Sequence, residues 1–254
     1  MQKRQFIKDL LLTGVAMPLG FNGMAKAFAS HAAKTPFELA QDNGFWEEIR
    51  QQYILKPDYI NLENGYYNFL PQPLLNKYIE HIKEINYQGS YYMRTVQWEN
   101  KQKSVIALAK VAGCQPEELI ITRNTTESLD TIIGGIHWQS GDEAIMAEQD
   151  YGAMLDMFKL VSDRHGVVNK IISVPNHPKD DTEIVDLYKN AITTKTKVIL
   201  VSHMINITGQ ILPIKKITEM AHQHGVQVIV DGAHAFAHIQ FSVADLGCDY
   251  YAAS

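Results

Sequence analysis

Cysteine is scarce in this sequence, and long apolar runs are lacking. The 254 residues contain two cysteines, Cys114 and Cys248, which lie far apart and form no CxxC motif. Neither a disulfide framework nor a zinc site with paired cysteines is therefore indicated. No apolar stretch reaches the length of an ordinary membrane-spanning helix. These shortages exclude a small disulfide-rich secreted domain and a multi-span membrane protein.

An excess of positive charge is lacking as well. Lysine and arginine together number 23 against 28 aspartates and glutamates, so the net charge is -5. Nucleic-acid-binding proteins usually carry a basic patch or stripe, so we expect no nucleic-acid partner. The hydrophobic share of 46% and charged share of 20% are typical of a globular protein. A chain of this length can bury a sizeable core.

The first 29 residues have the order of an export signal. Lys3, Arg4 and Lys8 precede an apolar stretch at 10–19, and a small-residue pattern ends at Ala29. The segment from Lys3 to Lys8 resembles the twin-arginine signal, with lysine replacing the first arginine. We predict an exported, periplasmic protein with no stable membrane insertion after processing. The alternative is an amphipathic helix that packs on a domain of a cytoplasmic protein.

After this segment, short apolar runs alternate with amphipathic stretches of helical length. The runs predicted as strands are 119–122, 144–147, 168–174, 198–201 and 226–230. The predicted helices are 45–53, 74–87, 99–112, 129–136, 154–165, 182–192 and 214–224. Helices between fully apolar strands indicate an α/β fold with a mostly parallel sheet flanked by helices. We predict an export signal at 1–29, an N-terminal segment at 30–73 and one large domain at 74–254.

Polar residues follow four of the five predicted strands, and another group stands at the end of the sequence; ligands of an open α/β sheet bind at the carboxyl ends of its strands. These segments are Arg123–Glu127, Glu148–Gly152, Ser202–Asn206, Asp231–His234 and the stretch from Tyr250 to Ser254. Thr125 and Thr126 stand before a predicted helix, so they could bind a phosphate or simply cap the helix. Asp231 could pair with a protonated ring nitrogen or serve as a turn residue. Surface packing, a turn and a helix start are the structural alternatives for Tyr151, Asn206 and His234.

Three of these segments resemble one enzyme family in order and spacing. They are Asn124–Glu127, Ser202–Gly209 and Val230–His234, and they resemble the class V aminotransferases. Tyr151-Gly152 and Asn64-Gly65-Tyr66-Tyr67 look most like the isopenicillin N epimerase-like branch. The resemblance runs from about residue 59 to residue 254. It implies the large domain of the aspartate-aminotransferase fold (fold type I) and the cofactor pyridoxal 5'-phosphate.

The resemblance also implies a role for each residue of the site. Thr125 and Thr126 would hold the cofactor phosphate, and Asp231 would pair with the pyridinium nitrogen. Tyr151 would stack on the ring, and Asn206 and His234 would lie near its phenolic oxygen. The residues expected to face the substrate are Asn64 and Tyr66. The expected reaction is transamination or epimerisation of an amino acid or amine through an external aldimine, in a homodimeric full-length protein.

Ser254 marks a departure from the family pattern. The pattern after the last strand is Ser-x-His-Lys, in which serine also binds the cofactor and lysine forms the Schiff base; this sequence stops at the serine. We therefore expect a fragment of a longer protein that lacks the Schiff-base lysine and the C-terminal small domain. By this reading, no catalytic residue is present in the chain.

Three alternatives stay open. A cysteine desulfurase has the same fold, but its catalytic cysteine would lie in a later segment than Cys114 and Cys248. A truncated homologue could bind a partner or ligand without catalysis. A metal-dependent hydrolase could use Asp and His as ligands, and the candidates are Glu148, Asp231, His234 and His238.

Overall fold

A computed structural model describes residues 29–254 of the chain. The predicted export signal lies almost wholly outside these residues and stays a prediction. The chain divides into two compact units, Met1–Val111 and Ala112–Ser254, which are called unit 1 and unit 2 below. The predicted domain limits at residues 30 and 74 also stay predictions. The division by packing falls after Val111.

The described part of unit 1 is helical. Its elements are α3 (Pro36–Ala40), α4 (Asn43–Arg50), α5 (Gln72–Gln88), the π-helix η2 (Tyr92–Val96) and α6 (Gln97–Ala112), whose last residue belongs to unit 2. Thr35 begins α3 with a capping box, in which Glu38 reciprocates the hydrogen bond. Pro71 and Pro73 flank the start of α5, where a missing amide costs nothing. These features confirm the three helices predicted in this region, with ends shifted by a few residues.

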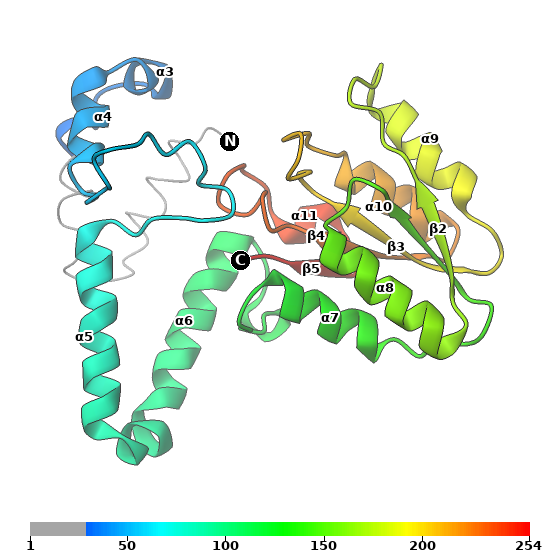
Figure 1. Cartoon of the computed structure of the whole chain (residues 1–254), viewed down its shortest axis with the longest axis horizontal. Helices are drawn as coiled ribbons and strands as arrows, with labels where there is room; N and C mark the ends of the chain where they lie inside the picture. The colour runs from blue at the N-terminus through cyan, green and yellow to red at the C-terminus, as the bar shows by residue number, and fades with distance from the viewer. Residues whose placement is uncertain (1–28) are drawn as a thin grey trace. The chain divides into compact units, whose positions relative to one another are not determined.

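Unit 2 is a parallel α/β layer structure (Figure 1). Its helices are η3 (Pro116–Glu118), α7 (Thr125–Gly135), α8 (Gly152–His165), α9 (Asp181–Ala191), α10 (Ile214–Gln223) and α11 (Val243–Leu246). Its strands are β1 (Glu143–Ala147), β2 (Val168–Ile172), β3 (Thr196–Ser202), β4 (Gln227–Asp231) and β5 (Tyr250–Ala252). All neighbouring strands pair in parallel, in the order β2-β1-β3-β4-β5. The predicted α/β fold class is confirmed.

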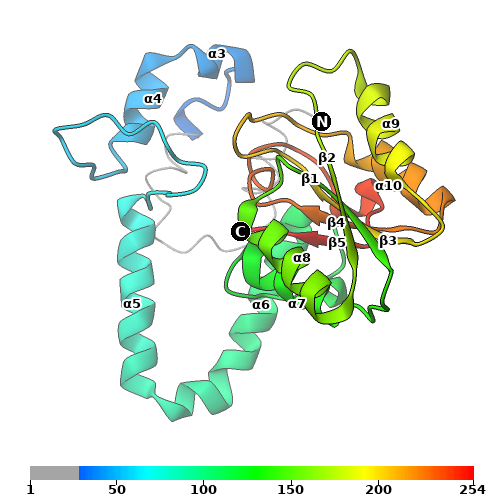
Figure 2. The ribbon, with the colours of Figure 1, turned by 45° about the vertical axis from the view of Figure 1, so that its right-hand side comes forward.

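Alternating strand residues build two cores, one on each face of the sheet. Helices α7 and α8 cover one face, on which Leu129 and Phe158 pack against Met146 and Leu200. Helices α9 and α10 cover the other face, on which Tyr188 and Ile217 belong to the core. Figure 2 shows this three-layer arrangement. Because both faces are covered, β1, β3 and β4 are apolar almost throughout, as strands of a parallel sheet must be.

One predicted strand is wrong. Leu119–Thr122 forms no strand and pairs with no strand in the described part of the chain. The apolar residues of this segment suggested a buried strand, but Ile120 is 83% exposed. A four-residue apolar run becomes a strand only when a neighbouring strand supplies its hydrogen bonds. The sheet ends at β5, so residues 119–122 add no further strand beside it.

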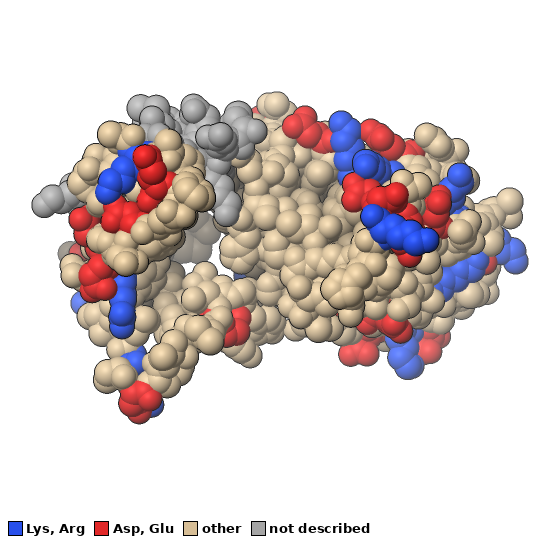
Figure 3. Space-filling model, turned by 90° about the horizontal axis from the view of Figure 1, so that it is seen from above, with Lys and Arg blue, Asp and Glu red and all other residues tan. Residues whose placement is uncertain are grey.

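The surface carries both signs of charge. Figure 3 shows acidic and basic side chains lying beside one another on the face in view, without a broad field of one sign among the coloured residues. None of the helices within residues 29–254 combines the length and apolar character that a bilayer crossing requires.

Candidate functional site

The strand order predicts where the sheet would bind a ligand. Strand β1 is followed by β2 on one side, whereas β3, β4 and β5 lie on the other side. Ligands of open α/β sheets bind outside the carboxyl ends of the strands, at the point where the strand order reverses. That point lies between β1 and β3 in this protein. The residues that follow β1, β3, β4 and β5 are therefore brought to one edge.

The start of α7 forms one end of this edge. Asn124 caps the helix, because its side-chain oxygen accepts the amide of Glu127 at 2.9 Å. Thr125 is buried, and its amide donates to Ser254 Oγ at 3.0 Å. The Thr125 and Ser254 hydroxyl oxygens are 2.6 Å apart, although 129 residues separate them in sequence. A helix N-terminus with converging hydroxyls suits a phosphate, because its free amides attract anions.

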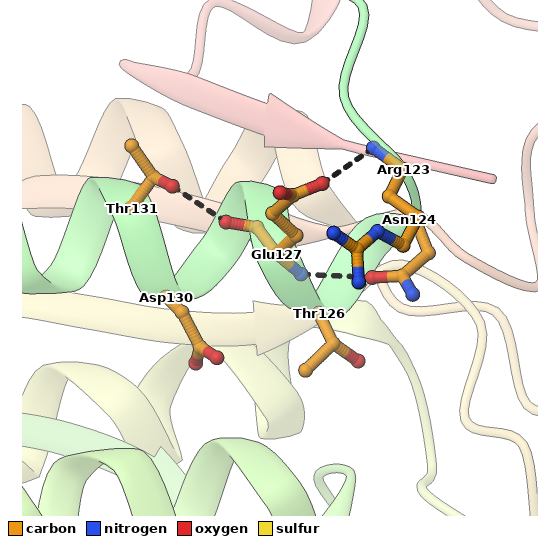
Figure 4. Close-up of a pocket in the computed structure, with 6 residues that line it drawn as sticks. All are labelled: Arg123, Asn124, Thr126, Glu127, Asp130 and Thr131. Atoms are coloured by element: carbon orange, nitrogen blue, oxygen red, sulfur yellow. Dashed lines mark hydrogen bonds between the residues drawn. The ribbon is translucent and has the colours of Figure 1, made fainter.

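Thr126 lies beside this pair, in an open hollow of about 520 Å³ (Figure 4). The hollow is lined by Arg123, Asn124, Thr126, Glu127, Asp130 and Thr131. Within it, the Glu127 carboxylate accepts the amide of Arg123 at 2.5 Å. That bond ties the loop to the first turn of α7 and sets the backbone of the predicted phosphate end.

Asp231 ends β4 as a buried carboxylate. Its side chain accepts the amide of Ala233 at 3.0 Å, and the residue is 8% exposed. Burial raises its pKa, and the hydrogen bond from Ala233 and the nearby His234 counter that rise. Within residues 29–254, no lysine or arginine forms an ion pair with it. A buried carboxylate without a fixed cation is suited to a cationic ligand.

An aromatic cluster supports the backbone of Asp231. The amide of His203 donates to the Asp231 carbonyl at 2.8 Å, and His203 Nδ1 lies 3.1 Å from the Tyr251 hydroxyl. Burial lowers the pKa of His203 to about 4, so the ring is neutral near pH 7. Gly232 leaves room for the Tyr251 ring beside Asp231, because a Cβ at position 232 would overlap that ring. Phe241 completes the cluster, with its ring centroid 4.7 Å from that of His203.

Asp150 is buried between the carboxyl ends of β1 and β3. Its carboxylate accepts the Ala147 amide at 2.8 Å, the Ser202 amide at 3.1 Å and the Ser202 hydroxyl at 2.7 Å. Burial raises its pKa to about 6, and the charge of Asp231 adds to the rise, while the three hydrogen bonds oppose it. The two carboxylates therefore influence each other electrostatically at the same edge.

The other predicted residues lie in different surroundings. Tyr151 is half-buried at the start of α8 and packs on the core under α7 and α8. Asn206 is exposed in the turn that follows β3, and His234 is half-buried in the turn after β4. Asn64 and Tyr66 are exposed residues of unit 1, so the structure of unit 2 alone does not bring them to this edge.

Sequence reasoning assigned no role to Asp150, Ser202, His203 or Tyr251. All four stand in the segments that follow strands, so their positions were a usable signal. The structure adds their burial and mutual hydrogen bonds. The metal alternative gains no support, because the described residues contain no group of three or more His, Cys, Asp or Glu side chains placed to hold a metal ion.

The fold and this edge define a class of α/β enzyme that binds its ligand at the carboxyl ends of parallel strands. The aminotransferase class-V family matches residues 70–254, which is most of the chain. The chain belongs to that family. Its cofactor is pyridoxal 5'-phosphate, as the sequence resemblance predicted.

Known relatives agree on the family and differ in activity. Isopenicillin N epimerase from Streptomyces clavuligerus is 26% identical over 213 residues, which cover 82% of this chain and 52% of that protein. Cysteine desulfurase from Escherichia coli O7:K1 is 31% identical over 138 residues, covering 53% of this chain and 33% of that protein. The chain spans about half the length of the epimerase relatives it matches.

The fold is shared with solved structures of such enzymes. A mutant of C-DES with glycine covalently linked to the PLP cofactor matches with a TM-score of 0.71 and 23% identity, over 81% of this chain and 55% of that chain. The residues present fit the cofactor chemically. The hydroxyl-lined start of α7 suits its phosphate, and the buried Asp231 suits its pyridinium nitrogen.

Proposed function

We propose that the full-length protein uses pyridoxal 5'-phosphate to activate the α-carbon of an amino acid or amine, for epimerisation or transamination. The observation that carries this proposal is Asp231, a buried carboxylate at the end of β4 that has no lysine or arginine partner in residues 29–254. When bound, the cofactor supplies an electron-withdrawing ring to the α-carbon. The epimerase relatives, aligned over 82% of this chain, favour the first reaction.

Each residue of the edge then has a defined task. Asp231 keeps a proton on the ring nitrogen, because the ionised carboxylate stabilises the nearby cation. Thr125, Thr126 and Ser254 hold the phosphate through hydroxyls and helix amides. Tyr151 covers one face of the ring and excludes water from it. Asn206 and His234 lie near the phenolic oxygen, and Asn64 and Tyr66 are the residues proposed to face the substrate.

We further propose that the full-length protein carries the cofactor on a lysine three positions after Ser254. The basis is Ser254 itself, which begins the family pattern Ser-x-His-Lys and contacts Thr125 at the phosphate end. Borohydride reduction of the full-length holoprotein, followed by peptide mapping, should locate a pyridoxyl group on that lysine. A modified lysine elsewhere would refute this assignment.

The reaction is tested by exchange of the substrate α-proton. The full-length holoprotein is incubated with single enantiomers of a panel of amino acids in deuterated water, and NMR and chiral chromatography follow the products. An epimerase should incorporate deuterium and form the opposite enantiomer without a keto acid partner. A transaminase should form a keto acid only with an amino acceptor. Lack of exchange with every amino acid and amine tested would contradict the proposal.

Cysteine desulfurase is the second candidate, and the 31% identical Escherichia coli relative favours it. In the described chain, both cysteines are poor nucleophiles. Burial raises the pKa of Cys114, and it raises that of Cys248 to about 11. A desulfurase would therefore need a cysteine outside this chain. Release of alanine and persulfide sulfur from L-cysteine by the full-length protein would select this function over epimerisation.

Assembly and location complete the proposal. We propose a homodimer for the full-length protein, to be measured by sedimentation equilibrium. We also propose export through the twin-arginine route, which transports folded proteins and would allow the cofactor to be loaded first. N-terminal sequencing of the exported protein should give a start near Ser30, and Arg4→Gln should retain the precursor inside the cell.

A further inference from the structure

The Asp150 carboxylate joins β1 and β3 at their carboxyl ends, where the two backbones are no longer paired. The paired residues of β1 and β3 end at Ile145 and Ile199, two residues before β1 itself ends. Beyond that point the Asp150 carboxylate accepts amides from both strands, Ala147 on β1 and Ser202 on β3. One buried side chain therefore joins the two strands where their backbones no longer pair.

The groups on either side of this carboxylate belong to the candidate site. Tyr151 follows Asp150 directly and is the N-cap residue of α8, with its carbonyl accepting the Met154 amide at 2.8 Å. Ser202 precedes His203, whose amide holds the Asp231 carbonyl. A movement of Asp150 would thus be transmitted to Tyr151 through one peptide bond. It would be transmitted to Asp231 through Ser202 and one further hydrogen bond.

We propose that Asp150 is a positioning residue that sets the separation between Tyr151 and Asp231, and with it the orientation of the cofactor ring between them. The Ser202 hydroxyl is the second part of this device, because it gives the carboxylate a third donor and keeps it between the two strands. Asp150 does not touch the ring in this account. The inference rests on the proposed placement of the ring between Tyr151 and Asp231.

The test uses visible circular dichroism of the full-length holoprotein. The cofactor is achiral, so its visible dichroism arises only from a fixed orientation in an asymmetric site. Asp150→Asn replaces one acceptor oxygen by an NH2 group, which would face an amide donor from either Ala147 or Ser202. We expect this variant to retain bound cofactor, because the phosphate end is unchanged. Its dichroism per bound cofactor should fall at least twofold.

Asp249→Asn is the matched control. Asp249 is also an aspartate that joins neighbouring strands, since it precedes β5 and its carboxylate accepts the amide of Val228 at 2.7 Å. It lies at the amino edge of the sheet, away from the site, so its dichroism should equal that of the parent. Ser202→Ala removes one donor of the device and should give a smaller loss than Asp150→Asn, and it decides the question if Asp150→Asn does not fold.

Asp231→Asn separates the two possible failures. If it leaves the visible spectrum and dichroism of the holoprotein unchanged, the placement of the ring is wrong and the proposed function fails with it. If it changes them while the folded Asp150→Asn and Ser202→Ala variants keep parental dichroism, the positioning role of Asp150 is refuted alone. Equal losses in Asp150→Asn and Asp249→Asn would also refute it, because a general loosening of the sheet would then explain both.

Discussion

Acidic residues have opposite surroundings at the two ends of the parallel strands in unit 2, which are called the amino edge and the carboxyl edge of the sheet. At the amino edge, Glu143 lies 2.9 Å from Lys170, and Asp142 lies 3.1 Å from Lys197. The pKa of Asp142 is lowered, first by a backbone hydrogen bond from Gln139 and then by Lys197. Burial raises the pKa of Glu143, but hydrogen bonds from Lys170 and two threonines outweigh it and leave the pKa lowered.

At the carboxyl edge, burial raises the pKa of both Asp150 and Asp231. Neither has a lysine or arginine partner in the described part of the chain. At the amino edge, Asp142 and Glu143 thus form ion pairs with lysines of the same unit, and these pairs stabilise the fold. At the carboxyl edge, Asp150 is held by three hydrogen bonds within the fold, whereas Asp231 has only the Ala233 amide as a side-chain donor among the described residues and is suited to a cationic ligand. That difference separates structural from functional acidic residues more sharply than residue type does.

Removal of the Asp231 charge should have the largest effect. Asp231→Asn keeps an acceptor for the Ala233 amide but cannot stabilise a protonated ring nitrogen. We expect α-proton exchange by the full-length protein to fall by about 10²–10³-fold, the range for loss of one preorganised electrostatic group. Cofactor binding should persist in weakened form through the phosphate end. Glu143→Gln at the amino edge is the control and should retain exchange; equal losses in both would erase the contrast between the edges.

The pH dependence of stability should differ in sign between the edges. Burial raises the pKa of Asp150 to about 6, above the pKa of an aspartate in the unfolded chain. The stability that protonated Asp150 contributes is therefore fully present below the unfolded pKa and is lost as pH rises through 6. Between pH 4 and 7 this loss is about 3 kcal/mol at 1.36 kcal/mol per pKa unit. Urea unfolding of the cofactor-free full-length protein should show it, and Asp150→Asn should remove it.

Asp142 and Glu143 should behave in the opposite way. The pKa values of both carboxyl groups are lower in the folded protein than in the unfolded chain. The stability that these two ionised side chains contribute is therefore present above the unfolded pKa and is lost as pH falls. Glu143→Gln should therefore weaken the protein at pH 7 more than at pH 4. If Asp150→Asn instead steepened the fall in stability between pH 4 and 7, the assigned direction of the Asp150 pKa would be wrong.

Gly232→Ala probes the packing behind Asp231. The added Cβ would overlap the Tyr251 ring, so the ring or the strand end would have to move. We expect a loss of about 1–3 kcal/mol in unfolding free energy, as for other overpacked sites, together with weaker cofactor binding. Gly152→Ala is the control, because a Cβ there meets no atom within 4 Å. Equal stability of the two variants would show that Tyr251 moves aside freely.

The smallest effect is expected at the amino edge. Lys170→Met removes the ion pair with Glu143, whose carboxylate still accepts a hydrogen bond from Thr196. The pair is partly exposed, so the loss should be about 0.5–1 kcal/mol and should shrink at high salt. Cofactor dichroism should not change. A change in that signal would mean that the two edges are coupled through the sheet.

Much of the fold was predictable because its signals are local. The central residues of β1, β3 and β4 are apolar, and a strand covered on both faces requires that pattern. The segment at residues 119–122 has the same pattern, but its pairing depends on a neighbour that local sequence does not reveal. Thr125 and Asp231 stand at the ends of α7 and β4, where local sequence signals placed them, and Ser254 contacts Thr125. Their roles toward the cofactor stay predictions.

The sequence by itself determined β1, β2, β3 and β4 and the polar residues that follow β1, β3 and β4, because hydrophobic periodicity acts over a few residues. It did not reveal β5, and it predicted a strand at residues 119–122 that does not form. Only the tertiary structure decided the order β2-β1-β3-β4-β5, and with it the place between β1 and β3 at which Asp150 joins two strands. Burial also had to come from the fold. Aspartates at the two edges are identical in the sequence, but the pKa of each depends on the water, cations and amide donors that surround it in the folded protein.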